Sequence, residues 1–269
     1  MQTILDSQFR RLVWAHYKLH GRTMPWRAQP TPYNVVVSEI MLQQTQVERV
    51  IPKFESFTKR FPTFAALAGA PLDEVLIQWV GLGYNRRANY LHQLSKRVVG
   101  SYHGLLPKTV DDLEALPGVG PQTAGAILAY AYNLPAVFIE TNIRTVYLHH
   151  FFADRSGVDD KEIVPIVERT LDVTQPREWY WALMDYGTSL KKTIGNQNHR
   201  SRHYTRQSTF AGSSRQLRGT VVKLLAERPL NRHELAEVIG DERLQSVIDR
   251  LVKDGLVEEV GSRVQLKGR

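Results

Sequence analysis

The chain of 269 residues contains no cysteine. This absence excludes disulfide bonds, a thiol nucleophile, a zinc site with cysteine ligands and an iron–sulfur cluster held by thiolates. No uncharged apolar stretch reaches the length of a membrane-spanning helix, and residues 1–12 lack the apolar run of a signal peptide. We therefore expect an intracellular, cytoplasmic protein without a membrane segment.

Acidic residues are fewer than basic ones in this sequence. Lys and Arg number 35 against 27 Asp and Glu, which gives a formal net charge of +8 at pH 7. A basic surplus of this size favours a polyanionic partner such as DNA or RNA. The hydrophobic share of 42% is ordinary for a folded protein and excludes a wholly disordered chain.

Strand-like alternation is nearly confined to the end of the chain, whereas apolar residues recur at helical spacing through most of it. One predicted helix begins at Pro32, extends past Val47 and is ended or kinked at Pro52. Further prolines divide the remaining pattern into short helices joined by turns. The sequence therefore predicts a mainly α fold.

A shift in composition near Lys191 indicates a domain boundary. Between Gly187 and Gly219 there are seven Lys or Arg residues and no Asp or Glu, which is typical of a basic connector. Beyond it the pattern predicts three helices, the second opened by a capping box of Asn231 and Glu234, and a β-hairpin about Gly261. We expect a core over residues 1–190, a connector over 191–212 and a winged helix-turn-helix-like domain over 213–269.

The third helix of that last domain has a balanced charge. Its charged residues are Asp241, Glu242, Arg243, Asp249, Arg250 and Lys253. A helix that enters the major groove of DNA carries a positive surplus. Packing or a protein partner is therefore at least as good an interpretation of this domain as contact with DNA.

The segment Leu116-Pro117-Gly118-Val119-Gly120 lies between two predicted helices. Gly118 and Gly120 permit a tight turn whose backbone N–H groups face outward at a helix N-terminus, where a phosphate oxygen is favoured. Small residues from Ala124 to Ala126 let the two helices pack closely. Together with the basic surplus, the segment predicts a helix-hairpin-helix clamp on the DNA backbone rather than a plain helical turn.

Two carboxylates are candidate catalytic residues. Glu39 lies in the run from Ser38 to Gln46, at or near an apolar helix face, which favours a protonated acid. Glu140 follows a short apolar run and opens a helical stretch. A salt bridge for Glu39 and a helix-dipole partner for Glu140 are the alternatives, and neither carboxylate identifies an enzyme alone.

Five segments, in their order and spacing, resemble the helix-hairpin-helix DNA glycosylases and, among these, adenine glycosylases of the MutY type. The segments are Met24-Pro25-Trp26-Arg27, Ser38 to Val47, Gly81-Leu82-Gly83-Tyr84, Leu116 to Gly120 and Ala182 to Gly187. The resemblance covers roughly the first 190 residues. It implies a two-lobed α-helical core that bends double-stranded DNA, flips a nucleotide out and cuts its N-glycosidic bond.

The resemblance also implies roles for three residues in catalysis. Glu39 matches the family's Glu that protonates adenine N7. Glu140 falls where the family carries an Asp that stabilises the oxocarbenium-like sugar, and Asn142 matches a nearby Asn.

Contacts with DNA follow from the same resemblance. Gln43 and Tyr84 match residues that wedge into the base stack, whereas Trp26 and Arg27 match residues that line the base pocket. Core packing is the alternative for Tyr84 and Trp26.

This sequence departs from the family at three places. Pro121 and Gln122 follow Gly120, at a place where strand-cleaving relatives carry a Lys. Without that amine we expect no lyase activity. We expect Gln122 to contact DNA. We expect the winged helix-turn-helix-like domain in place of the family's domain that inspects 8-oxoguanine. The iron–sulfur loop is replaced by Asn196 to Tyr204, which has no cysteine, and we therefore expect no cofactor.

Within that loop we expect Arg200 and Arg202 to bind DNA. His199 and His203 have a spacing that could suit a metal, but no third ligand is apparent, so we expect no metal and favour hydrogen bonding to phosphate or backbone.

Our leading hypothesis is a monomeric, nucleoid-associated enzyme that removes adenine from mispairs with 8-oxoguanine or guanine in double-stranded DNA. A mismatch thymine or uracil glycosylase of the same fold is one alternative, because Gln122 and Glu140 both depart from the family. A non-catalytic DNA-binding regulator is the other, against which the presence of Glu39 argues.

Overall fold

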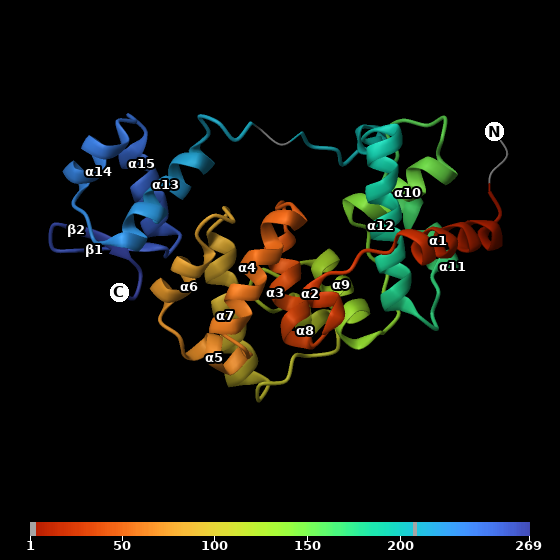
Figure 1. Ribbon diagram of the computed structural model, residues 1–269, viewed down its shortest axis with the longest axis horizontal. Coiled ribbons are helices and arrows are strands. Elements are labelled where there is room, and N and C mark those ends of the chain that lie inside the picture. Colours follow the sequence, from red (N-terminus) through yellow and green to blue (C-terminus); the bar gives the residue numbers. More distant parts are fainter. Residues whose placement is uncertain (1–3, 207–208) are drawn as a thin grey trace. The chain divides into compact units, whose positions relative to one another are not determined.

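The computed structural model describes residues 4–206 and 209–269, and they are mainly helical, as the sequence predicts (Figure 1). The chain divides into two compact units, each assembled from segments that lie far apart in the sequence. Helix α3 (Pro32–Leu42) begins in the first unit and ends in the second. None of the helices described is long and apolar enough to cross a membrane.

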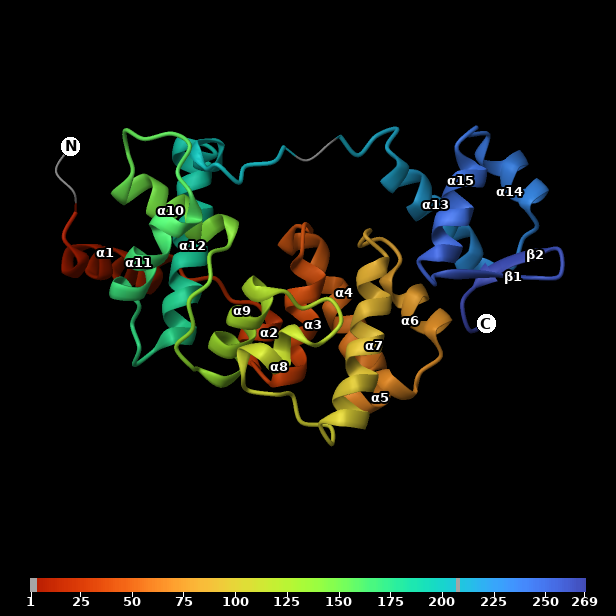
Figure 2. The same cartoon turned by 180° about the vertical axis from the view of Figure 1, so that it is seen from behind.

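The first unit comprises residues up to Val35, 108–114 and 119–206. Its elements are α1 (Asp6–His20), α2 (Pro25–Ala28), α8 (Val110–Glu114), α9 (Pro121–Tyr132), α10 (Thr141–Phe151), α11 (Asp160–Thr170), α12 (Pro176–Ile194) and a 3₁₀ turn, Gln197–Arg200. Helices α10 and α12 lie side by side, as Figures 1 and 2 both show. Phe9 of α1 packs its ring against Tyr147 and Trp179, which joins α1 to both helices.

The second unit comprises residues 36–107, 115–118 and 207–269. Its first helices are α4 (Val47–Arg60), α5 (Phe64–Gly69), α6 (Leu72–Trp79) and α7 (Arg86–Ser101). An aromatic cluster of Phe57, Phe61 and Trp79 joins α4 to α6, and all three side chains are buried.

The helix predicted from Pro32 past Val47 is in fact two helices, which corrects that expectation. Helix α3 ends at Leu42, and Pro52 lies inside α4 instead of ending a helix. The cause is Arg87, a buried side chain of α7 that donates hydrogen bonds to the carbonyls of Ile40 and Met41, both at 2.8 Å. These carbonyls are the acceptors that a continued helix would use, so Arg87 caps α3 and the chain turns away.

The C-terminal module, residues 213–269, has the element order that the sequence predicts. It contains α13 (Ser214–Glu227), α14 (Arg232–Ile239) and α15 (Leu244–Lys253), followed by the antiparallel strands β1 (Val257–Val260) and β2 (Arg263–Leu266). The predicted capping box of Asn231 and Glu234 opens α14. Helix α13 and strand β2 both pack against α6, so the module belongs to the second unit.

The sequence placed the boundaries of the domains near residues 190 and 213, and these stay predictions. Helix α12 runs to Ile194, so Lys191 and Lys192 lie in its last turn. Lysines are favourable there because the C-terminal end of a helix carries partial negative charge.

Candidate active site

Glu39 lies on α3, half-buried, between the buried residues Ser38 and Ile40. Four residues later, just after the C-terminal end of α3, is Gln43, whose side-chain amide donates to the carbonyl of Gly118 at 3.4 Å. Within the second unit, α3 therefore joins the candidate acid Glu39 to the first glycine of the predicted helix-hairpin-helix turn.

The turn itself depends on Gly118. Its φ of 81° lies in the left-handed region, and a Cβ atom there would come within 2.9 Å of Cβ of Tyr90. Both constraints exclude larger residues. Gly120 has an extended backbone and is the N-cap of α9, whose first residue is Pro121. Gly120 and Pro121 thus form the start of the second hairpin helix.

Tyr84 has a φ of 47°, which is rare for a residue with a bulky side chain. Two guanidinium groups contact its ring, with Arg87 at 5.5 Å and Arg215 of the C-terminal module at 5.0 Å from the ring centre. Arg215 also donates a hydrogen bond to the Tyr84 hydroxyl. A left-handed backbone held by such contacts is typical of functional positions.

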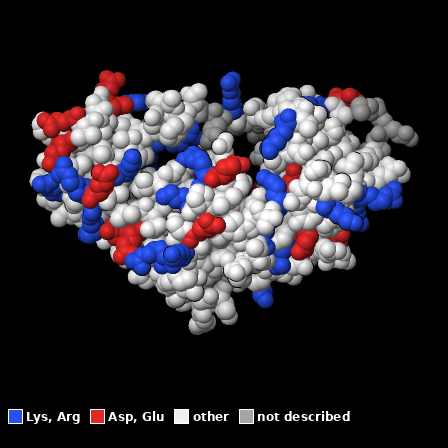
Figure 3. Space-filling view, viewed as in Figure 1, with Lys and Arg blue, Asp and Glu red and all other residues white. Residues whose placement is uncertain are grey.

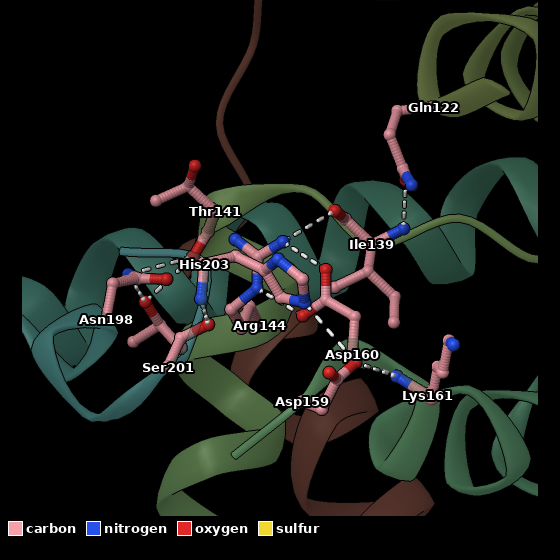
Figure 4. Close-up of polar contacts among 11 residues, drawn as sticks. Gln122, Ile139, Thr141, Arg144, Asp159, Asp160, Lys161, Asn198, Ser201 and His203 are labelled. Carbon is pink, nitrogen blue, oxygen red and sulfur yellow. Dashed lines mark hydrogen bonds and ion pairs between the residues drawn. The ribbon is translucent and has the colours of Figure 1, made fainter. Parts of the chain in front are cut away.

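Glu140, in the first unit, is half-buried and is the N-cap residue of α10. The segment that leads to it is fixed by Gln122, whose side-chain oxygen accepts the backbone N–H of Ile139 at 2.5 Å (Figure 4). One turn into α10, Arg144 forms a two-pronged ion pair with Asp160 at 2.6 and 2.7 Å. The start of α10 is thus held rigidly from two sides, and Gln122 acts on it through the backbone.

Asn142 has a partner that sequence reasoning missed. Lys191 of α12 donates to the Asn142 side-chain oxygen at 2.6 Å. Burial, with a smaller contribution from Arg144, lowers the pKa of Lys191 to about 8, against an opposing effect of Glu140. The helices approach closely because Gly187 faces Asn142, and a Cβ at Gly187 would fall 2.2 Å from the Asn142 carbonyl oxygen.

Arg27 is held by a buried carboxylate. Its guanidinium donates to both oxygens of Asp185 at 2.8 and 3.0 Å, and it lies over the ring of Trp181. Arg22 binds the same carboxylate through its Nε and its backbone N–H. Trp26, next to Arg27 on α2, is only 5% exposed. The Met-Pro-Trp-Arg segment is therefore anchored on α12 by Asp185, which sequence reasoning did not single out.

The Asp185→Asn variant should unfold at lower denaturant concentration, with a loss of about 3 kcal/mol, because two arginines lose their buried counter-charge. Burial raises the pKa of Asp185, but the bonds and charges of Arg27 and Arg22 outweigh it, and the net pKa lies below its usual value. The carboxylate therefore stabilises the fold above pH about 4, and this contribution is lost as the pH falls through the folded pKa.

Urea unfolding at pH 7 and at pH 3.5 measures this effect. Asp111→Asn, an exposed position in the same unit, is the matched control and should unfold like the wild type. Equal stability of Asp185→Asn and wild type at pH 7 would contradict the role given to Asp185.

The loop after α12 is held by side-chain-to-backbone hydrogen bonds. Buried Asn198 donates to the Thr141 carbonyl at 3.2 Å and to the Thr145 hydroxyl at 2.7 Å, which ties the loop to the start of α10. Arg200 donates to the carbonyls of Leu148 and Phe152, at the C-terminal end of α10. Arg200 thus caps a helix, a role that the basic pattern alone did not predict.

Arg202 and the two histidines of this loop lie at the surface. Arg202 is 73% exposed and 3.5 Å from Asp159, which His203 also contacts at 3.3 Å. His199 donates to the Asn196 carbonyl at 2.5 Å, which is the backbone bond favoured from the sequence. Among the residues that the structure describes, no three His, Asp or Glu side chains converge as metal ligands do. The loop also has no thiolate, so its residues do not fit an iron–sulfur cluster.

The sequence of this chain is similar to those of known DNA repair proteins. Residues 37–169 match the HhH-GPD superfamily of base excision DNA repair proteins. An adenine DNA glycosylase of Mycolicibacterium smegmatis is 33% identical over 276 residues, which cover 94% of this chain and 93% of that relative. An adenine DNA glycosylase of Buchnera aphidicola is 35% identical over 193 residues, or 70% of this chain, and the match spans only 52% of that relative's length.

A solved structure of a thermostable thymine-DNA glycosylase has the same fold. It superposes with a TM-score of 0.60 at 23% identity, over 68% of this chain and 85% of that one. The fold and the helix-hairpin-helix turn thus define a base excision DNA repair protein of the HhH-GPD superfamily. Within it the chain belongs to the adenine DNA glycosylase family of the MutY type, which confirms the resemblance drawn from its five segments.

Proposed function

We propose that this protein is a DNA glycosylase that removes adenine from mispairs with 8-oxoguanine or guanine. The observation that carries the proposal is the half-buried carboxylate of Glu39, four residues before a glutamine bonded to the helix-hairpin-helix turn. This arrangement joins an acid to a structure suited to a DNA phosphate. The near full-length similarity to an adenine DNA glycosylase supports adenine as the base.

In the proposed reaction the bond between C1′ of the sugar and N9 of adenine breaks. Glu39 donates its proton to adenine N7, so the base leaves as a neutral molecule instead of an anion. Positive charge develops on the sugar, and the ionised Glu140 stabilises it until water adds at C1′. The added water releases its proton to solvent, and the Glu39 carboxylate takes up a proton from solvent for the next turnover. The N-terminal end of α10 favours the anionic form that Glu140 needs.

The other candidate residues position the DNA. Gln43 and Tyr84 enter the base stack beside the flipped nucleotide, while Trp26 and Arg27 border its pocket. Asn142, held by Lys191, supports the sugar next to Glu140. The backbone N–H groups between Gly118 and α9 receive a phosphate. Arg202 contributes charge, and its exposed guanidinium suits contact with the backbone of double-stranded DNA better than the helix-capping Arg200 does.

We further propose that the enzyme releases the base without cutting the strand. A lyase needs an amine that attacks C1′, and the residues after the hairpin are Pro121 and Gln122, with the amide of Gln122 bonded to Ile139. The amine of Lys191 is engaged with Asn142. The intact protein acts as a monomer and requires no cofactor.

The test is a single-turnover panel of four duplexes, A:8-oxoguanine, A:G, T:G and U:G, with the released base identified by chromatography. We expect adenine from the first two and no base from the others. Release of thymine or uracil instead would establish a mismatch pyrimidine glycosylase. Tight binding without release from any duplex would establish a non-catalytic regulator. Strands cut before alkali treatment would contradict the proposed lack of lyase activity.

A further inference from the structure

A pocket of about 640 Å³ lies within the second unit, between α7 and the helices α13 and α15 of the C-terminal module. Its cations are Arg86, Arg87, Arg215, Arg218, Arg250 and Lys253, and Asp254 is the one carboxylate among the described residues that line it. The volume is in the range of ligand sites, about 300–1,000 Å³. The excess of cations predicts an anionic ligand for this basic pocket.

The cations reach the basic pocket because of their helical spacing. Arg215 and Arg218 are three residues apart on α13, and Arg250 and Lys253 are three apart on α15, so each pair shares a helix face. Arg86 of α7 adds a third source. Three separate helices thus place cationic side chains in the lining of one pocket.

The acidic residues of α15 and its neighbourhood are engaged elsewhere. Asp249 pairs with Arg232 of α14 at 2.6 Å, and Asp241 pairs with Arg243 at 2.6 Å. On the face seen in Figure 3, acidic and basic side chains are interspersed over the part that Figure 1 labels α13 to α15. Asp241 and Asp249 thus pair with arginines outside the basic pocket, whereas Arg250 and Lys253 line it.

Arg250 and Lys253 are the cations best placed to bind a ligand. Both side chains are exposed, and neither forms a hydrogen bond or ion pair with any residue that the structure describes. Arg218 and Arg86, in contrast, both contact Asp254, at 2.6 and 3.6 Å.

The basic pocket adjoins the helix-hairpin-helix turn. Gln43 lines the pocket and bonds to Gly118, and Tyr90 lines it and packs directly against Gly118. Gln44 and Tyr84, also in the lining, both have left-handed backbones. The basic pocket therefore borders the part of the turn that lies in the second unit, at Gly118.

We propose that the basic pocket clamps the phosphodiester backbone of double-stranded DNA, with Arg250 and Lys253 on its phosphate oxygens. This rests on the proposed function and gives the C-terminal module a direct part in DNA binding. Guanidinium groups bind phosphate through two parallel hydrogen bonds, and tyrosine rings beside them suit the sugar and base of a nucleotide. The pocket is also much larger than one phosphate ion.

The experiment compares Arg250→Ala/Lys253→Ala with wild type by fluorescence anisotropy over a range of NaCl concentrations. Affinity should fall about 10-fold for an A:8-oxoguanine duplex and equally for the fully paired duplex, because phosphate contacts carry no sequence information. The slope of log affinity against log salt should decrease by about 2, one for each lost phosphate contact.

The matched control is Lys59→Ala/Lys223→Ala, which removes the same charge from two exposed positions of the same unit outside the pocket. It should bind DNA like the wild type. An equal loss of affinity in the control would reduce the effect to overall charge and overturn the proposal. Unchanged affinity of Arg250→Ala/Lys253→Ala would also overturn it, in favour of an acidic protein partner.

Inorganic phosphate and deoxyadenosine monophosphate distinguish DNA from a free anion. At millimolar concentration neither should displace the duplex from the wild type beyond the effect of NaCl at equal ionic strength. Specific displacement that is lost in Arg250→Ala/Lys253→Ala would make the pocket a free-anion site and contradict the proposal. Anisotropy does not depend on base release, so failure of the glycosylase assignment would leave this result interpretable.

Discussion

Glu39→Gln is expected to lower the single-turnover rate of base release by about 10³-fold, within the range that general-acid catalysis contributes. Glutamine keeps the size of the side chain and its place on α3, but its amide is far too weak an acid to transfer a proton to adenine N7. Without that proton the base must leave as an anion, and the barrier rises accordingly.

DNA binding by Glu39→Gln should remain at the wild-type level. The helix-hairpin-helix turn and the basic pocket use Gly118 and cations that the substitution does not touch. Glu48→Gln, an exposed glutamate on α4, is the matched control and should release base normally. Wild-type rates for Glu39→Gln on every duplex of the panel would show that Glu39 is not the acid.

Glu140→Gln should slow base release by about 10²-fold, the effect expected when one group that stabilises developing charge is removed. The reason differs from that for Glu39, because Glu140 acts as an anion. Its N-cap position on α10, fixed through Gln122 and the Arg144–Asp160 pair, holds the carboxylate in place before the charge develops.

Glu140→Asp separates charge from length. It keeps the anion but shortens the side chain by one bond, so its rate should lie above that of Glu140→Gln. Glu168→Gln, an exposed glutamate on α11, is the control for a general change in charge. Equal rates for Glu140→Gln and wild type, or for Glu140→Gln and Glu140→Asp, would show that the charge of Glu140 plays no part in base release.

Local sequence patterns predicted the parts of this structure that local physics decides. The glycine of the hairpin turn, the capping box at Asn231 and the C-terminal β-hairpin each depend on residues within a few positions of one another. A left-handed turn or a capped helix end has the same requirements in any fold, so these predictions could be made without knowing the tertiary structure.

Long-range contacts decide the features that the sequence did not predict. The end of α3 depends on Arg87, more than forty positions away, and the anchor of Arg27 depends on Asp185. Arg200 is of a residue type that commonly contacts DNA, yet its side chain caps α10. The basic pocket could not be predicted from the sequence for the same reason. Its cations come from three helices, and Asp249 of α15 pairs with Arg232 of α14 only in the folded chain.

The most direct test of the account is the time course of free adenine released by excess wild-type enzyme from one A:8-oxoguanine duplex, with Glu39→Gln alongside. We expect one adenine for each bound duplex with the wild type, an abasic strand that breaks only on alkali treatment, and almost no adenine with Glu39→Gln. A bound duplex that keeps its adenine, or equal release by both proteins, would contradict it.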